Sequence, residues 1–246
     1  MTKRILILGG TSDALELANH LSTNERFRLI YSLAGRVEHP RVPNQSCEIR
    51  KGGFGGIDGL ASYLTTHRIQ AIIDATHPFA AQITRHAEVA SQTTGIPLLI
   101  YARPPWTSLP QDRWHEVPNL QHAAALIPSL GRRVFLAIGR QEVSVFAYCT
   151  DAHFLIRSIE PPTGPLPPDA NILLARGPFY LDDELTLLRD HAIDVIVTKN
   201  SGGPATYPKV EAAREMQIPV IMVQRPPATS ARPVTTIPAV EEWLKS

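Results

Sequence analysis

A turn rich in glycine and hydroxyl side chains follows the first apolar run of the chain. Gly9-Gly10-Thr11-Ser12-Asp13-Ala14 comes directly after Arg4–Leu8, and apolar residues at helical spacing begin at Ala14. Glycines between a strand and a helix let the backbone approach a phosphate, whose charge the helix N-terminus attracts. The pattern departs from G-x-G-x-x-G, because Thr11 stands at the middle glycine and Ala14 at the third. The turn predicts a phosphate or dinucleotide site, and the alternative is an ordinary strand–helix turn capped by Thr11 or Ser12.

A basic residue follows the second apolar run, Leu29–Leu33. The chain continues as Ala34-Gly35-Arg36, which places Arg36 26 residues after Gly10 (36 − 10). An NAD site usually has an acidic residue near this position, whereas a guanidinium can pair with the 2′-phosphate of NADP. Arg36 therefore favours NADP over NAD, and the alternative is a solvated surface arginine.

Two further loops of the first half carry residues suited to a ligand. Gly52-Gly53-Phe54-Gly55-Gly56 can bring the backbone close to a flat ligand or a ribose, or it can be a flexible turn. Asp74-Ala75-Thr76-His77-Pro78-Phe79-Ala80 contains a histidine that can hydrogen-bond a ligand, transfer a proton or fix its own loop. In a doubly wound sheet the loops after the strands converge on one edge. We expect these loops to meet there.

Basic and amide side chains follow the apolar runs of the second half. The segments are Ile138-Gly139-Arg140-Gln141, Ala175-Arg176-Gly177-Pro178-Phe179 and Val197-Thr198-Lys199-Asn200-Ser201-Gly202-Gly203. Such a rim suits a ligand that carries carboxylates. The segment from Lys199 is a polar donor cluster, whereas single arginines such as Arg140 and Arg176 can also pair with neighbouring carboxylates.

Short β-branched or leucine-rich runs alternate with segments of helical periodicity along the whole chain. This pattern predicts an α/β fold of two Rossmann-like domains with mainly parallel sheets and a ligand cleft between them. Residues 102–118 contain four prolines and little periodicity, so we expect one domain over 1–115 and another over 116–246. The expected strands are Arg4–Leu8, Leu29–Leu33, Cys47–Arg50, Ala71–Ala75, Ile96–Tyr101, Val134–Ile138, Phe154–Ile156, Ile172–Leu174, Val195–Thr198 and Pro219–Val223.

Composition excludes several classes of function. The 24 basic and 23 acidic residues give no large positive field for nucleic-acid binding. Cys47 and Cys149 are too few for a disulfide framework or a structural zinc site, which indicates a reducing, cytoplasmic setting and no metal. No segment approaches the roughly 20 apolar residues that span a bilayer. We expect a protein that inserts in no membrane and is a monomer or a small homo-oligomer.

The motifs together resemble the precorrin-6A reductase family of corrin-ring biosynthesis. The resemblance covers nearly the whole chain and rests on several ordered segments. These are Ile7–Ala14, Ser32–Arg36, Gly52–Gly56, Asp74–Ala80, Gly139–Gln141, Ala175–Phe179 and Thr198–Gly203. It implies an enzyme that uses NADPH to reduce one double bond of precorrin-6A, or of its cobalt-containing counterpart, to the 6B form of cobalamin synthesis.

The resemblance also implies roles for individual residues. The first domain would hold NADPH and the second the tetrapyrrole, whose acetate and propionate groups would meet basic and amide donors. The cofactor-binding candidates are Gly9, Gly10, Thr11, Ser12, Asp13, Ala34, Gly35, Arg36, Gly53, Thr76 and His77. The substrate-binding candidates are Arg140, Gln141, Arg176, Lys199, Asn200, Ser201 and Gly202. Lys199 and His77 are the candidates for proton delivery, for which an ordered water is the alternative.

Two other functions fit parts of this pattern, and a third fits it poorly. An NADPH-dependent reductase of a smaller substrate would share the loops of the first half. A nucleotide-binding sensor or regulatory module without catalysis would use the paired halves for ligand-driven closure. A tetrapyrrole synthase that needs no nicotinamide cofactor conflicts with Arg36 and the glycine turn. The sequence does not distinguish a cobalt-containing from a metal-free substrate.

Overall fold

The computed structural model describes residues 2–35, 37–44, 47–227 and 233–245, which form two compact units. Met1–Pro104 and Pro226–Ser246 make up the first unit, and Pro105–Arg225 the second. The expected division at residues 115 and 116 is wrong in two respects. Residues 105–115 belong to the second unit, where Trp114 begins an edge strand, and the C-terminal segment returns to the first unit, where Val240 and Leu244 enter the core.

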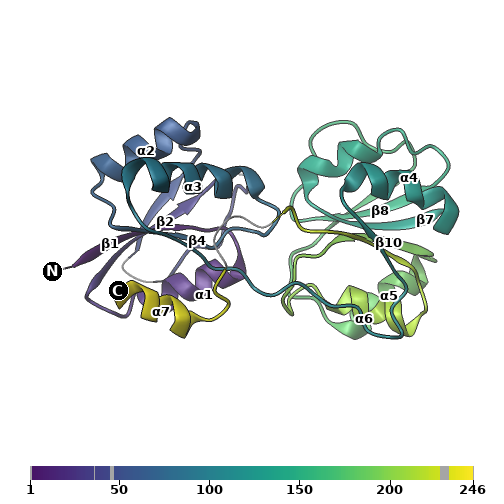
Figure 1. Ribbon diagram of the computed structural model, residues 1–246. Coiled ribbons are helices and arrows are strands. Elements are labelled where there is room, and N and C mark those ends of the chain that lie inside the picture. The colour runs from purple at the N-terminus through teal and green to yellow at the C-terminus, as the bar shows by residue number, and fades with distance from the viewer. Residues whose placement is uncertain (1, 36, 45–46, 228–232, 246) are drawn as a thin grey trace. The chain divides into compact units, whose positions relative to one another are not determined.

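The first unit is a five-stranded parallel sheet covered by helices on both faces. Its strands are β1 (Lys3–Leu8), β2 (Phe27–Leu33), β3 (Cys47–Lys51), β4 (Ala71–Asp74) and β5 (Leu98–Ile100), in the order β3-β2-β1-β4-β5. Its helices are α1 (Ser12–Leu21), α2 (Gly56–Thr66), α3 (Ala81–Thr94) and α7 (Ile237–Lys245). Helices α2 and α3 lie on one face of the sheet, and α1 and α7 on the other (Figure 1).

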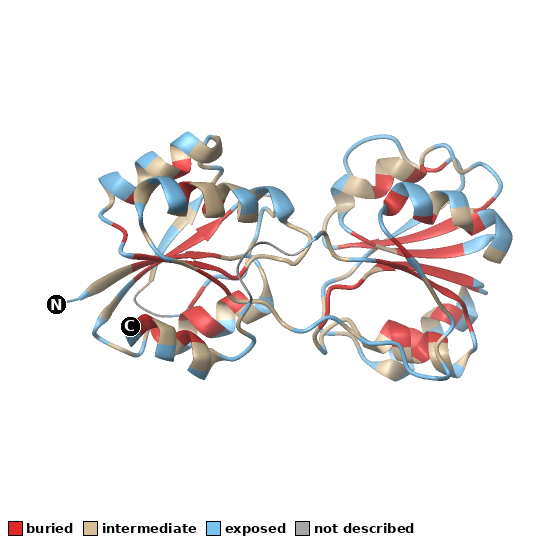
Figure 2. Cartoon of the chain, in the orientation of Figure 1, coloured by how far each residue is buried: buried red, intermediate tan, exposed pale blue. Residues whose placement is uncertain are grey.

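The alternation of side chains along β1 explains these two layers. Ile5 and Ile7 pack into a cluster with α1 and α7, whereas Leu6 and Leu8 pack into a cluster with α2 and α3. All four side chains are buried, because a parallel strand with helices on both faces has no solvent side. Figure 2 shows the buried strands at the centre of each unit.

The second unit is a six-stranded parallel sheet, also covered on both faces. Its strands are β6 (Trp114–Val117), β7 (Arg133–Ala137), β8 (His153–Ser158), β9 (Ala170–Leu174), β10 (Val195–Lys199) and β11 (Val220–Val223), in the order β6-β11-β10-β7-β8-β9. Its helices are α4 (Leu120–Leu130), the 3₁₀ helix η1 (Arg140–Phe146), α5 (Leu181–Asp190) and α6 (Pro208–Glu215). Helices α5 and α6 share one face and α4 covers the other (Figure 1). The α/β class with two parallel sheets is thus confirmed.

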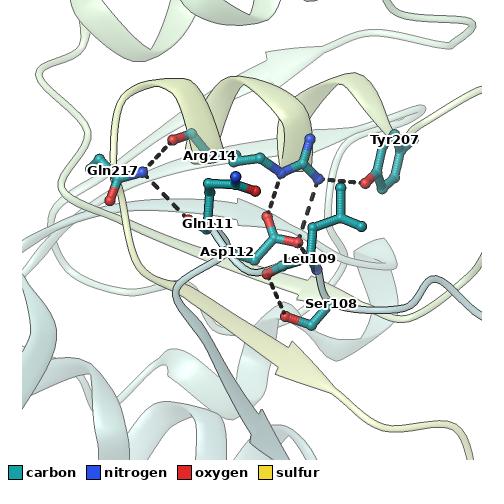
Figure 3. A network of polar contacts seen from close by, with 7 residues as sticks. All are labelled: Ser108, Leu109, Gln111, Asp112, Tyr207, Arg214 and Gln217. Carbon is teal, nitrogen blue, oxygen red and sulfur yellow. Dashed lines mark hydrogen bonds and ion pairs between the residues drawn. The ribbon is translucent and has the colours of Figure 1, made fainter.

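A buried ion pair fixes the start of the second unit. Figure 3 shows the carboxylate of Asp112, whose side chain is only 1% exposed, between Arg214 of α6 and the backbone of Leu109. Asp112 accepts from Arg214 Nε at 2.8 Å and from the Leu109 N–H at 2.7 Å. Burial lowers the pKa of Arg214, but hydrogen bonds to Asp112 and Tyr207 outweigh burial and raise this pKa above its ordinary value.

We expect Asp112→Ala to lower the free energy of unfolding of the second unit by about 2 kcal/mol, because Arg214 and the Leu109 N–H lose their acceptor. Urea unfolding followed by tryptophan fluorescence measures the change, since Trp106 and Trp114 both lie in this unit. Asp190→Ala, which removes an exposed carboxylate from the same unit, is the control. Equal stability of the two variants would contradict the role of Asp112.

Candidate active site

Each sheet has one point at which the strand order reverses. In the first unit the chain builds β1, β2 and β3 outward in one direction and then returns to place β4 on the other side of β1. In the second unit β7, β8 and β9 run in one direction, and β10 lies on the other side of β7. Loops separate at such switch points, and ligands of open α/β sheets bind there. Two loops at the first switch point carry candidate residues: Gly9–Asp13 follow β1, and Thr76 and His77 follow β4. At the second switch point, Arg140 and Gln141 follow β7, while Lys199 is the last residue of β10 and is followed by Asn200–Gly202.

The hydroxyl of Thr11 joins the two loops at the first switch point. Its Oγ1 donates to the carbonyl of Ala75 at 2.9 Å and accepts from the N–H of Ala14 at 3.0 Å, which caps α1. The N–H of Ala75 in turn donates to the carbonyl of Leu8 at 3.0 Å. Threonine therefore replaces the middle glycine of the motif because its hydroxyl caps α1 and holds the loop after β4.

The two glycines of this turn serve different purposes. A Cβ on Gly9 would lie 2.4 Å from the ring of Tyr31, so Gly9 is needed for packing. Gly10 has φ = +110°, where a Cβ would meet only Leu33 Cδ2 at 3.9 Å, and its N–H donates to Tyr31 Oη at 3.1 Å. Burial raises the pKa of Tyr31, so its hydroxyl stays protonated at neutral pH. Gly10 is thus the residue at which the backbone is open to a ligand.

The start of α1 combines exposed amides with a neutralised acid. Ser12 and Asp13 lie in the first turn, where N–H groups have no intrahelical acceptor and attract anions. The Asp13 carboxylate would oppose an anion, but it pairs with Arg103 Nη1 at 2.9 Å. Arg103 therefore keeps this helix end suitable for a phosphate.

Asp74 and His77 set the geometry of the loop after β4. Asp74 is 2% exposed, and its Oδ1 accepts from the N–H of Thr76 at 3.0 Å and from Thr76 Oγ1 at 2.6 Å. The N–H of Phe79 donates to His77 Nδ1 at 3.3 Å. Because Nδ1 accepts, the proton of the neutral ring lies on Nε2. His77 therefore presents an N–H donor at its other ring nitrogen.

The loops after β2 and β3 lie against each other. The N–H of Gly52 donates to the carbonyl of Leu33 at 2.9 Å, and a Cβ on Gly35 would lie 3.6 Å from Gly52 N. Gly35 has φ = +75°. The structure thus brings Gly35 against Gly52, so the loops that carry Ala34 and Gly53 meet as expected from the sequence, while Arg36 lies outside the described residues.

An ion pair occupies the second switch point. Lys199 Nζ, at the end of β10, donates to Glu142 Oε2 in η1, and the Lys199 side chain is 11% exposed. A Cβ on Gly139 would lie 2.9 Å from the same carboxylate oxygen, so glycine leaves room for Glu142. Arg140 Nη1 lies 2.9 Å from Oε2 of Glu160, a residue of the loop after β8, and forms an ion pair with it. Gln141 is exposed.

Asn200 and Ser201 make contacts with the segments at both ends of the second unit. Asn200 Oδ1 accepts from the N–H of Trp106 at 2.7 Å, and its Nδ2 donates to the carbonyl of Trp106 at 2.9 Å. Arg225 donates to the carbonyls of Asn200 and Ser201 at 2.9 and 3.0 Å. Gly202 has φ = +70°. The Asn200 side chain therefore fixes its own loop through Trp106.

Arg176 is an exposed residue of the loop after β9. Its neighbours Gly177 and Pro178 are joined by a cis peptide bond. The N–H of Phe179 in the same loop donates to the carbonyl of Ala205 at 3.1 Å. This contact ties the Arg176 loop to the loop that begins at Lys199.

Comparison with known proteins decides the family. The profile described as "Precorrin-6x reductase CbiJ/CobK" matches residues 4–245. This chain belongs to the precorrin-6x reductase family. It is 52% identical to the precorrin-6A reductase of Rhodococcus erythropolis over 93% of this chain and 91% of that one. It is 28% identical to the cobalt-precorrin-6A reductase of Priestia megaterium over 90% of each chain. A solved structure described as "CobK precorrin-6A reductase" superposes with a TM-score of 0.91 at 42% identity, covering 99% of this chain and 96% of that one.

The resemblance stated from the motifs is therefore confirmed, but sequence reasoning missed residues that shape the site of this precorrin-6x reductase family member. Glu142 directly follows the quoted Gly139–Gln141 motif and was the easiest to find. Arg103 lies among the prolines of the crossing, where nothing in the sequence marks it as the partner of Asp13. Among the described residues no cluster of three metal-ligating side chains is present, and no described helix is long and apolar enough to cross a membrane.

Proposed function

We propose that this protein reduces one double bond of precorrin-6A with NADPH, giving the 6B form in cobalamin synthesis. Membership of a reductase family supports the reaction class. The single structural observation that carries the proposal is that several candidates of each kind lie at the switch points of the sheets. Those for the cofactor are Gly9–Asp13, Thr76 and His77, which follow β1 and β4, and those for the substrate are Arg140, Gln141 and Lys199–Gly202, around β7 and β10.

The residues of the first unit suit a dinucleotide phosphate. Gly10 carries no side chain where the chain turns with φ = +110°, and the first turn of α1 supplies N–H groups. Arg103 neutralises Asp13, the carboxylate nearest to these amides in the sequence. Ser12 and Asp13 would hold the pyrophosphate through their backbone N–H groups, next to the close backbone approach that Gly10 allows, and Thr76 and His77 offer further polar groups.

Reduction of the double bond requires a hydride and a proton. Bound NADPH supplies the hydride, and the protein contributes positioning and the route of the proton. Lys199 is our candidate for delivering the proton or for stabilising the electron-rich macrocycle, because Glu142 holds its ammonium group at the end of β10. His77 is the second candidate, through Nε2. Arg140 and Arg176 would bind carboxylates of the macrocycle.

We propose the metal-free macrocycle as the preferred substrate. The relative named for precorrin-6A is 52% identical to this chain, whereas the relative named for cobalt-precorrin-6A is 28% identical over a similar share of the chain. The difference supports the metal-free assignment.

Anaerobic loss of NADPH absorbance with purified protein tests the proposal. We expect oxidation with metal-free precorrin-6A, slower oxidation with the cobalt form, and little with NADH in place of NADPH. A faster reaction with the cobalt form would overturn the substrate assignment. No oxidation with either macrocycle, together with measurable NADPH binding, would instead favour a nucleotide-binding module without catalysis.

A further inference from the structure

Arg50 is a cation at the ligand-binding edge of the first sheet that has no acidic partner among the described residues. It lies near the end of β3, opposite Ser32 of β2 in the parallel register. Three other basic residues near the sheet edges are paired: Arg103 with Asp13, Arg140 with Glu160 and Lys199 with Glu142. In the described chain the hydrogen-bond acceptors of Arg50 are two carbonyls and one hydroxyl, all neutral.

The guanidinium of Arg50 is held in one orientation. Nη1 donates to the carbonyl of Gly52 at 2.5 Å and contacts Ser32 Oγ at 3.4 Å, and Nη2 donates to the carbonyl of Gly53 at 2.8 Å. The guanidinium carbon lies 3.7 Å from the ring centre of Phe54. A planar cation fixed against an aromatic face and two carbonyls loses little conformational entropy when it binds an anion.

Unused donors remain on this guanidinium. Arg50 has five N–H groups, and the three contacts to Ser32, Gly52 and Gly53 involve only Nη1 and Nη2. In the part of the chain that the structure describes, Nε has no acceptor. Burial lowers the pKa of Arg50, as expected for a positive charge that is partly desolvated without a counter-ion. An anion at this position would restore the charge balance.

The position of Arg50 indicates which anion would bind. Gly52, whose carbonyl accepts from Arg50, also lies against the turn at Gly35 after β2. In dinucleotide-binding folds the adenosine ribose lies at the end of the second strand, where its 2′ substituent is recognised. We propose that Arg50 binds the 2′-phosphate of NADPH and is a determinant of the preference for NADPH over NADH.

This inference rests on the proposed use of NADPH and assigns a residue that the motifs did not indicate. Binding of the 2′-phosphate by Arg50 differs from a purely structural role of Arg50 in one measurable respect. If Arg50 only shaped the Gly52–Gly56 loop, its loss would weaken the binding of NADPH and NADH alike. If it contacts the 2′-phosphate, its loss would weaken only ligands that carry this group.

The test is equilibrium binding of NADPH and NADH, measured by the change in nicotinamide fluorescence, to the full chain and to Arg50→Ala. We expect the Kd for NADPH to rise about tenfold, as for loss of one charge-assisted contact, while the Kd for NADH changes less than about twofold. Adenosine 2′,5′-bisphosphate and 5′-AMP, used as competitors, should show the same selective loss. Arg28→Ala, at the amino-terminal half of β2 and exposed, should change neither value.

Arg50→Lys is the control that separates loss of the positive charge from loss of the loop structure. It keeps the positive charge but cannot donate to Gly52 and Gly53 as the planar guanidinium does, so we expect it to retain part of the NADPH preference. Equal weakening of both cofactors, or an unchanged NADPH/NADH ratio in Arg50→Ala, would overturn the assignment of Arg50. A full-length protein without any preference for NADPH would overturn the proposed cofactor itself, and with it this contact.

Discussion

Lys199→Met is expected to lower kcat for NADPH-dependent reduction of precorrin-6A by about 100-fold, the lower end of the usual contribution of a positioned proton donor. Methionine preserves most of the volume of the side chain but removes its charge and its N–H donors. Because Lys199 belongs to the second unit, we expect little change in the Kd for NADPH, which the first unit would bind.

The geometry around Lys199 explains the size of this effect. The aliphatic part of the side chain is largely covered, since the side chain is only 11% exposed, and Glu142 fixes the ammonium group. The residue also begins a tight turn, in which the N–H of Ser201 donates to the carbonyl of Lys199 at 2.7 Å. If Lys199 is the proton donor, this fixed position places it in advance for the transfer, and we expect a water molecule in its place to transfer the proton more slowly.

Steady-state and single-turnover measurements of hydride transfer test this prediction. Lys245→Met, in α7, is the matched control, because this lysine is 69% exposed and far along the chain from the candidate residues. Unchanged single-turnover hydride transfer together with unchanged turnover in Lys199→Met would remove Lys199 from the mechanism. A rise in KM for the macrocycle at unchanged kcat would make it a binding residue only.

The sequence predicted the strands that are buried on both faces, and also the exposed edge strands β3 and β9. Arg4–Leu8 and Val195–Thr198 were expected within one residue of the limits of β1 and β10, because a strand covered by helices reads as an unbroken apolar run. The edge strand β6 was missed because Trp114-His115-Glu116-Val117 contains no apolar run and lies between Pro110 and Pro118. The return of α7 to the first unit was missed for another reason: amphipathic spacing indicates a helix but not the sheet that it covers.

The candidate site was predictable in its loops but not in its contacts. Strand ends of a parallel sheet meet at one edge, so the position of Gly10 or Lys199 follows from the pattern of strands. Which charges pair depends on side chains that are distant along the chain. Lys199 and Glu142 are 57 residues apart, and Asn200 and Trp106 are 94 apart. Asn200, expected to bind substrate, is an example: its side-chain amide accepts from the N–H of Trp106 and donates to the carbonyl of Trp106.

The buried pair of Arg157 and Glu184 shows the same limit and leads to the largest expected effect on stability. The sequence marks Glu184 only as one of three acids in the first turn of α5. In the structure both side chains are buried, at 7% and 2% exposure, and the guanidinium contacts both carboxylate oxygens. The guanidinium carbon also lies 3.7 Å from the ring centre of Phe179, in the loop that carries Arg176.

We expect Arg157→Ala to lower the free energy of unfolding of the second unit by about 3–5 kcal/mol, because it leaves the Glu184 carboxylate buried without its counter-ion. The double variant Arg157→Met with Glu184→Leu should recover most of this loss, since an apolar pair of similar volume needs no desolvated charges. Urea unfolding followed by the fluorescence of Trp106 and Trp114 measures both, with Arg132→Ala as a control at an exposed position of the same unit. A single variant as stable as the control, or a double variant less stable than Arg157→Ala, would show that the pair does not act as a buried charge couple.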